Sequence, residues 1–163
     1  MEKTSYVIAL GSNRRHRDHG APAHVLAAVA DVLSGAGIET LARAPIFHTA
    51  AVGPAGRRFA NGALLVRTTL PPDALLGQLK ATERAFGRRR GRRWGPRVLD
   101  LDIILWSEGR WHGAGLAIPH PGFRVRRFVL DPVATIAPDW RDPVSGRSIR
   151  QLRAHLVRRR ATQ

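Results

Sequence analysis

Cysteine is absent from the 163 residues of this chain. No disulfide framework and no thiolate metal site can therefore form, and the composition gives no support for secretion. Long apolar runs are missing as well, because no uninterrupted stretch approaches the roughly 20 residues that a membrane-spanning helix needs. The N-terminus also lacks a basic run followed by an apolar signal core. From these absences we expect a cytoplasmic protein without a membrane segment.

Lysine and acidic residues are both scarce. Only Lys3 and Lys80 are lysines among the 27 basic residues, and 12 acids leave a formal net charge of +15. Arginine binds phosphate through a planar bidentate fork, so the bias fits phosphate recognition, although arginine enrichment also follows from genome composition. A basic field attracts any nucleic acid without specificity. The composition therefore leaves both phosphate ligands and polyanions open as partners.

The hydrophobic pattern predicts a mixture of strands and helices in one globular domain covering residues 1–163. Strands are expected over 5–10, 38–48, 59–69, 98–106 and 116–118. A first helix opens at Pro22, and a second starts at Pro71-Pro72-Asp73 and ends at Gly87. An apolar helix-like segment over 128–138 and a last helix capped by Ser148 follow. The order βαββαβ predicts an α+β fold, with a ferredoxin-like antiparallel sheet and helices on its faces.

The first two helices each present an apolar face at helical spacing. These faces are predicted to pack against the sheet, and they consist of Val25, Leu26, Val29, Val32 and Leu33 in the first helix and of Leu75, Leu76, Leu79 and Phe86 in the second.

Two acids stand out in the strand predicted over 98–106. Side chains alternate along a strand, so Asp100 and Asp102 face the same side, with their Cα atoms about 6 to 7 Å apart. Two carboxylates on an otherwise apolar strand are costly to bury unless arginines or a divalent metal ion pair with them. Mg²⁺ takes one or two carboxylates and completes its shell with water and phosphate oxygens. A magnesium site and a structural pair neutralised by arginine both remain open.

Three further patterns allow either a purely structural or a functional interpretation. The arginine run at 88–93 is either a solvated loop or a clamp on phosphates. His120 lies between Pro119 and Pro121, which either aim its side chain or only stiffen a turn. Residues 49–56 form either a simple connection or a lid.

The run from Arg93 to Ile103 reads Arg-Trp-Gly-Pro-Arg-Val-Leu-Asp-Leu-Asp-Ile and resembles the signature of the 6-hydroxymethyl-7,8-dihydropterin pyrophosphokinase family. The resemblance extends from Ala9-Leu10-Gly11-Ser12-Asn13 to Pro119-His120-Pro121 and Arg126-Arg127-Phe128-Val129-Leu130. It implies the ferredoxin-like fold and Mg²⁺-dependent transfer of diphosphate from ATP to the hydroxymethyl group of a reduced pterin, a step of folate biosynthesis. It also implies a monomer that acts on small molecules, with no specific nucleic acid and no membrane as partner.

Site residues follow from the resemblance by position. The implied catalytic residues are Arg88, Arg97, Asp100 and Asp102, of which the two aspartates would hold two Mg²⁺ ions. The implied ATP-binding residues are Glu83, Arg90, Trp94, Ile103, His120 and Arg126. The implied pterin-binding residues are Thr49, Ala50, Val52, Phe59, Asn61, Trp94 and Phe128.

The chain also departs from the family pattern. Thr49-Ala50-Ala51 replaces the usual Thr-Pro-Pro, and Gly115 and Ala117 stand where many relatives carry polar groups. These departures leave open a non-catalytic paralogue that binds pterin or nucleotide. A basic RNA-binding module is a weaker alternative, because the central strands lack the exposed aromatic pattern that such modules use.

Overall fold

The structure is a computed structural model, and it describes residues 1–12, 22–49, 59–87, 99–113 and 115–162. Its main sheet is built from β1 to β5, and a separate two-stranded hairpin follows. The elements are β1 (Thr4–Ser12), α1 (Pro22–Gly35), β2 (Glu39–Arg43), β3 (Phe47–Thr49), β4 (Phe59–Thr68), α2 (Pro72–Gly87), β5 (Asp100–Trp106), β6 (Trp111–Gly113), β7 (Leu116–Ile118), the 3₁₀ turn η1 (Phe123–Val125), α3 (Arg127–Ile136) and α4 (Ile149–Ala161).

The main sheet is antiparallel, and its strand order is β2-β4-β1-β5, with β3 also paired to β4. This order is the one that a βαββαβ chain adopts in the ferredoxin-like fold. The predicted fold class is therefore confirmed. The hairpin of β6 and β7 corresponds to a strand that was expected at 116–118 and to a partner that was not predicted.

The strand predicted over 38–48 is wrong as a single element. It divides into β2 and β3, which pair with different parts of β4. Pro45 lies between them and has no N–H to donate to a ladder, so the strand cannot continue through it. The backbone N–H of Ala44 makes the last contact before the break, to the carbonyl of Ala63 at 2.9 Å.

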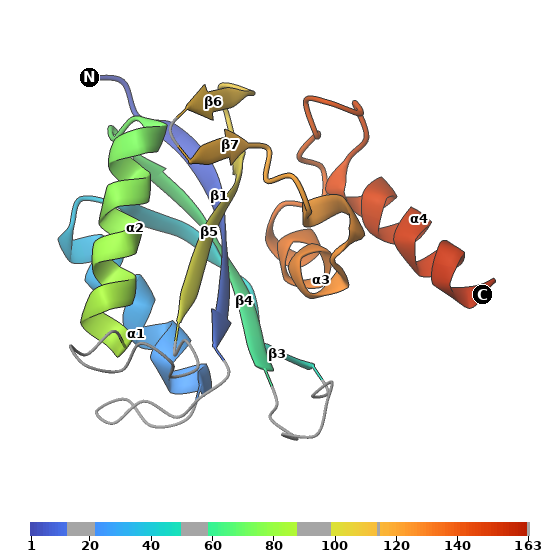
Figure 1. Cartoon of the computed structure of the whole chain (residues 1–163), viewed down its shortest axis with the longest axis horizontal. Helices are drawn as coiled ribbons and strands as arrows, with labels where there is room; N and C mark the ends of the chain where they lie inside the picture. The colour runs from blue at the N-terminus through green and yellow to red at the C-terminus, as the bar shows by residue number, and fades with distance from the viewer. Residues whose placement is uncertain (13–21, 50–58, 88–98, 114, 163) are drawn as a thin grey trace.

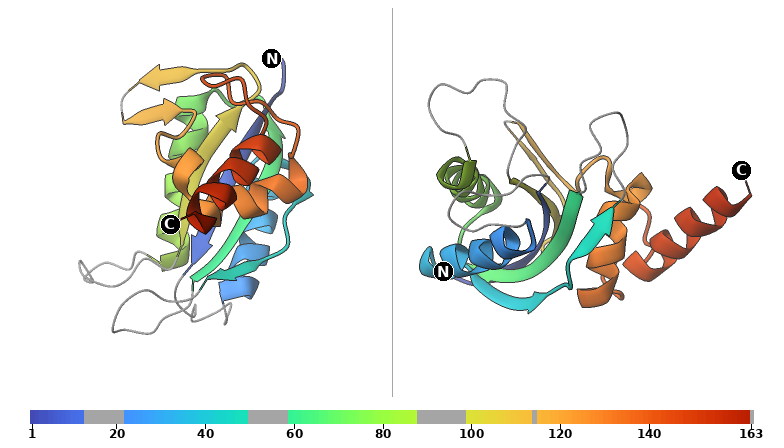
Figure 2. Two further views of the ribbon diagram at one scale, coloured as in Figure 1. Left: turned by 90° about the vertical axis from the view of Figure 1, so that its right-hand side faces the viewer. Right: turned by 90° about the horizontal axis from the view of Figure 1, so that it is seen from below.

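Helices cover both faces of the sheet, as Figures 1 and 2 show. On one face, α1 and α2 bury a cluster that includes Tyr6, Ile8 and Leu64. On the other face, α3 and α4 bury a second cluster that includes Val7 and Phe123. Neighbouring residues of β1 thus belong to opposite cores, because side chains alternate along a strand.

Most of the predicted packing faces are buried, with one error in α1. Val32 was placed on the core face, but its side chain is 41% exposed, because the buried stripe runs through Val25, Val29 and Leu33 and leaves Val32 at its margin. β1 also extends beyond the predicted 5–10 and includes Gly11 and Ser12. None of the helices in the described ranges is both long and apolar enough to cross a membrane.

The last helix begins where the sequence predicts. Ser148 is its N-cap, and its hydroxyl accepts a hydrogen bond from the backbone N–H of Gln151 at 3.2 Å. The Gln151 side chain accepts in return from the Ser148 N–H at 2.9 Å. This reciprocal capping box satisfies two backbone donors and fixes the start of α4.

Candidate active site

Asp100 and Asp102 lie on the edge strand β5, and both side chains are exposed. Their neighbours Leu101 and Ile103 are buried in the core under α1 and α2, so the two carboxylates point to the other side of the strand. Exposure removes the cost of burying two negative charges, so the fold needs neither an arginine nor a metal ion to offset such burial. The pair therefore has the orientation and the solvent access that a hard cation requires.

A row of residues crosses the sheet next to Asp100. Gly11 of β1 pairs with Asp100 on one side and with Asn61 of β4 on the other. A Cβ atom at Gly11 would lie 3.7 Å from Oδ1 of Asn61, an ordinary van der Waals distance, so the amide oxygen lies directly beside Gly11. The predicted metal-binding and pterin-binding residues are thus separated by a single strand, or about 10 Å between Cα atoms.

A cavity of about 420 Å³ adjoins the acid strand. That volume lies within the range typical of sites for small molecules. Its walls come from α2, from β5, from the hairpin of β6 and β7, and from the turn that follows β7. The lining residues are Leu76, Lys80, Asp102, Ile103, His112, Gly113, Gly115, Leu116, Ala117, His120 and Pro121.

Aromatic rings attach the hairpin wall to the sheet. Trp106 stacks on Tyr6 with ring centroids 6.0 Å apart and meets Trp111 edge-on at 5.9 Å. The indole N–H of Trp106 donates to Oγ1 of Thr4 at 3.0 Å. Gly115 has φ +75°, a conformation that favours glycine, which gives a structural reason for its departure from the polar residues expected there.

His120 follows the cis peptide bond between Ile118 and Pro119 and lies beside Asp102. Its backbone N–H donates to the carbonyl of Ile104 at 3.0 Å. Its Nδ1 accepts from the backbone N–H of Gly122 at 3.2 Å, so in the neutral ring the proton is on Nε2. Burial lowers the pKa of His120, Asp102 opposes this shift and Arg126 adds to it. A neutral imidazole with an Nε2–H donor therefore lies next to the acid pair.

Arg126 ends the same short segment. Its guanidinium packs against Gly122, where a Cβ atom would lie only 2.9 Å from Nε. It also lies over the ring of Phe128, 5.9 Å from the centroid. Arg126 and Phe128 are both exposed, so the cation and the ring remain accessible to a ligand.

Glu83 occupies the inner face of α2 and is only 4% exposed. Nζ of Lys80 lies 3.7 Å from its Oε1. Lys80 borders the cavity, so Glu83 is connected to the cavity through the lysine.

The structure brings together some of the predicted site residues. Asp102, Ile103 and His120 share the cavity, and Arg126 lies close enough to His120 to lower its pKa. On β4, Phe59 is exposed and Asn61 is buried, and both lie on the strand that pairs with β3, where Thr49 is the last residue. The predictions for Ala50, Val52, Arg88, Arg90, Trp94 and Arg97 concern residues outside the described ranges.

Sequence reasoning gave no site role to most of the cavity wall, and Leu76, Lys80 and His112 are the largest side chains that it missed on α2 and β6. Leu76 was assigned to the core, since it falls at helical spacing with Leu75 and Leu79. Lys80 and His112 were given no role. The available signal for Lys80 was its rarity together with its spacing of three residues from Glu83, which places the two on one side of the helix.

Three comparisons place these features among known proteins. The sequence profile of the family described as 7,8-dihydro-6-hydroxymethylpterin-pyrophosphokinase (HPPK) matches residues 7–138. A 2-amino-4-hydroxy-6-hydroxymethyldihydropteridine pyrophosphokinase of Synechocystis sp. is 45% identical over 125 residues, which cover 77% of this chain and 64% of the relative. The protein of the same name from Methylorubrum extorquens is 36% identical over 155 residues, or 94% of each chain.

Solved structures share the fold at low sequence identity. The wild-type HPPK-DHPS of Plasmodium falciparum with pteroate superposes with a TM-score of 0.73 at 13% identity. The superposition covers 99% of this chain and 44% of that longer chain. The similarity at this identity concerns the architecture alone.

Proposed function

Because the chain belongs to the 7,8-dihydro-6-hydroxymethylpterin-pyrophosphokinase family, we propose that it transfers the β,γ-diphosphate of ATP to 6-hydroxymethyl-7,8-dihydropterin. The observation that carries the proposal is the convergence of Asp102 and His120 on one cavity, with Arg126 beside them. The products are AMP and the pterin diphosphate. The assignment covers residues 1–163 as one catalytic domain that acts as a cytoplasmic monomer and needs no nucleic acid.

The reaction exchanges one phosphorus–oxygen bond for another. The hydroxymethyl oxygen attacks the β-phosphorus, its proton leaves to solvent, and the bond from that phosphorus to the α,β-bridging oxygen breaks. Negative charge accumulates on the bridging oxygen as AMP departs. The protein must therefore bring the anionic nucleotide and the neutral pterin alcohol together and neutralise charge around the transferring group.

Asp100 and Asp102 fit a magnesium site because both are exposed on one side of β5 next to the cavity. Two Mg²⁺ ions bound there would neutralise phosphate charge and lower the pKa of the acceptor hydroxyl. His120 donates from Nε2 to a phosphate oxygen, and Arg126 supplies a fixed positive charge nearby. Arg88 and Arg97, by their positions in the sequence, supply positive charge that neutralises the leaving group.

Pterin recognition falls to the Asn61 side of the sheet. A side-chain amide both donates and accepts, which matches the alternating groups on a pterin edge. Phe59 and Phe128 offer exposed aromatic faces for the planar ring. The remaining ATP-binding residues of the proposal are Glu83, Arg90, Trp94 and Ile103. The remaining pterin-binding residues are Thr49, Ala50, Val52 and Trp94.

Replacing Asn61 with alanine is expected to weaken affinity for the pterin alcohol about tenfold, since a hydrogen bond in a buried position is lost. ATP affinity should stay within about twofold, because Asn61 is not among the residues that line the nucleotide cavity. Titration calorimetry with each ligand measures the two effects. Thr40→Val, on the edge strand β2, serves as a control that should change neither affinity. Equal losses for both ligands would remove Asn61 from the pterin site.

The activity itself is tested by chromatography of AMP formed from ATP and Mg²⁺. AMP should appear with 6-hydroxymethyl-7,8-dihydropterin and should not appear with 6-methyl-7,8-dihydropterin, which lacks the attacking hydroxyl. Absence of AMP with the hydroxymethyl substrate would instead support a non-catalytic pterin-binding protein. Equal AMP with both pterins would indicate hydrolysis of ATP and would contradict the proposed transfer.

A further inference from the structure

The run from His120 to Arg126 carries two of the proposed ATP ligands at its ends, but its own backbone holds it weakly. The N–H groups of Phe123, Val125 and Arg126 donate within the run at 3.3, 3.4 and 3.4 Å. These distances are longer than the 2.9 to 3.0 Å that is usual for such bonds. A single 3₁₀ turn with weak hydrogen bonds needs contacts from outside to keep one conformation.

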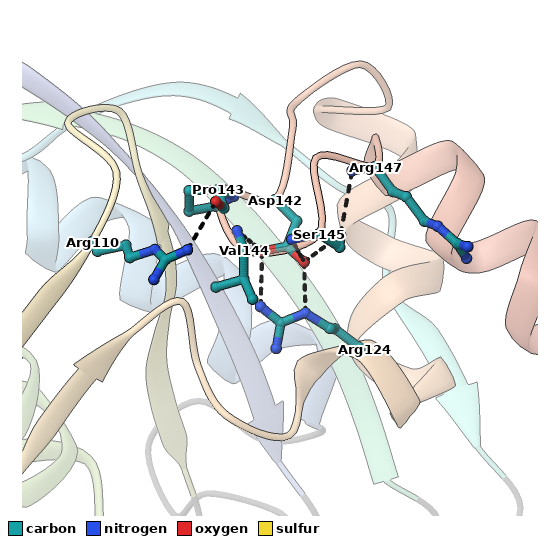
Figure 3. A network of polar contacts seen from close by, with 7 residues as sticks. All are labelled: Arg110, Arg124, Asp142, Pro143, Val144, Ser145 and Arg147. Carbon is teal, nitrogen blue, oxygen red and sulfur yellow. Dashed lines mark hydrogen bonds and ion pairs between the residues drawn. The ribbon is translucent and has the colours of Figure 1, made fainter.

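Three contacts fix the run from outside. At its start, the backbone N–H of His120 donates a hydrogen bond to the carbonyl of Ile104. In its middle, the Phe123 side chain is fully buried in the core under α3 and α4. On the opposite side of the run, Arg124 forms two hydrogen bonds to Asp142, from Nε to Oδ2 at 2.6 Å and from Nη2 to Oδ1 at 2.8 Å (Figure 3). The Arg124 guanidinium also lies 4.8 Å from the ring centroid of Phe123.

Asp142 is 0% exposed and is itself held firmly. Its carboxylate accepts from the Val144 N–H at 3.0 Å and from the Ser145 hydroxyl at 2.7 Å. Its carbonyl accepts from the N–H of Gly146 at 2.8 Å. Every oxygen of this acid thus has a defined donor, so the loop before α4 presents a preorganised anion to Arg124.

The same loop also contacts the hairpin wall of the cavity. Nη2 of Arg110, the residue before β6, donates to the carbonyl of Pro143 at 3.2 Å (Figure 3). Arg110 is exposed, whereas the Arg124–Asp142 pair is shielded. The hairpin and the run 120–126, which both contribute to the cavity wall, therefore contact the same loop before α4. The run makes an ionic contact with this loop, through Arg124.

We propose that Asp142 is a positioning residue for ATP: through Arg124 it fixes the run 120–126, so that His120 and Arg126 face the nucleotide phosphates in one orientation. The inference rests on the proposed function, since it assigns ATP as the ligand of those two side chains. A purely structural ion pair would stabilise the fold without favouring one substrate. The two roles differ in what happens to ATP affinity in protein that is still folded.

The test is a double-mutant cycle of R124M, D142N and R124M/D142N. Calorimetry measures affinity for α,β-methylene-ATP, in which the bond that would break is replaced, and then for the pterin alcohol at saturating analogue. All titrations are made well below the melting temperature of the least stable variant. Each single variant should lower the affinity for the analogue about tenfold and the affinity for the pterin less than about twofold. The double variant should bind the analogue no more weakly than either single variant.

The exposed pair Asp139 and Arg150 provides the matched control. Asp139 and Arg150 flank the loop that contains Asp142. Their side chains are 85% and 68% exposed, and the N–O distance between them is 3.2 Å. D139N and R150M make the same charge changes as D142N and R124M, so they measure how far the net charge of the protein alone changes its affinity for the ATP analogue. Both should leave the affinity for the analogue within about twofold.

A second readout follows the orientation of His120 directly. Nitrogen NMR of the imidazole should show the Nε2–H tautomer in the wild type and a mixture of tautomers in D142N. R124K, which keeps the charge but loses the bidentate fork, provides the measurement if D142N does not fold, and it should weaken the analogue at least threefold. Variants that melt earlier but keep both analogue affinity and the His120 spectrum would overturn the proposal. Failure of the proposed function would look different, because the wild type would then form no AMP with the hydroxymethyl pterin.

Discussion

Asp102→Asn is expected to lower the turnover number by about 10³-fold or more while the protein melts within about 2 °C of the wild type. The substitution keeps the side-chain volume and removes one negative charge from the proposed magnesium site. Because Asp102 is exposed, no buried partner loses its counter-charge. Asp100→Asn should act in the same direction. Turnover measured over a range of Mg²⁺ concentrations, together with thermal melting, records both parts of the result.

Asp31→Asn is the matched control, since it removes the same charge from an exposed position on α1, away from the cavity. It should retain turnover within about twofold, because a distant exposed charge is screened by salt. If Asp102→Asn were as active as this control, the magnesium assignment would be wrong. If it instead melted much earlier, the two aspartates would be a structural pair.

Asp142→Asn is expected to cost about 3 kcal/mol of unfolding free energy at pH 7, at the low end for a broken buried ion pair because Arg124 keeps 28% exposure. For a chain of this length that corresponds to a melting temperature lower by about 6 to 12 °C. The loss arises because the amide cannot accept two charge-assisted hydrogen bonds from the guanidinium. Thermal melting at several pH values measures it.

The pH dependence of this difference has a definite sign. Burial alone raises the pKa of Asp142, but hydrogen bonds from Arg124, Ser145 and the Val144 amide outweigh burial and hold the pKa well below its ordinary value. The stabilisation is therefore complete above the unfolded pKa of about 3.9 and is lost as the pH falls towards the folded one. The gap between wild type and D142N should be constant near neutrality and should narrow below about pH 4. A gap that widened in acid would contradict the ion pair.

Much of the fold could be predicted because its signals are local. The helix ends at Pro22, Pro72 and Ser148 follow from fixed backbone angles and capping, and β5 follows from a run of branched residues. The break at Pro45 could have been predicted from its missing N–H, but the apolar residues on both sides masked it. The Arg124–Asp142 pair has no such signal, since its partners are 18 residues apart and are brought together only by the tertiary fold.

The site was predictable only in part for a similar reason. Asp100 and Asp102 follow from strand alternation, whereas the meeting of Asp102 with His120 depends on how the segment after β7 returns to β5. A family resemblance could associate these residues, but periodicity could not. Lys80 was missed because a lysine on a helix is usually a solvated residue, and only the position of α2 over the edge strand brings it to the cavity.

Phosphorus NMR of a reaction mixture containing the protein, ATP, Mg²⁺ and 6-hydroxymethyl-7,8-dihydropterin shows which phosphate group is transferred and to which acceptor. We expect AMP and a diphosphate ester of the pterin to appear in equal amounts, without ADP, and neither to form at a comparable rate with Asp102→Asn. Formation of ADP with a pterin monophosphate, or of AMP with free inorganic diphosphate, would contradict transfer of the diphosphate group to the pterin alcohol.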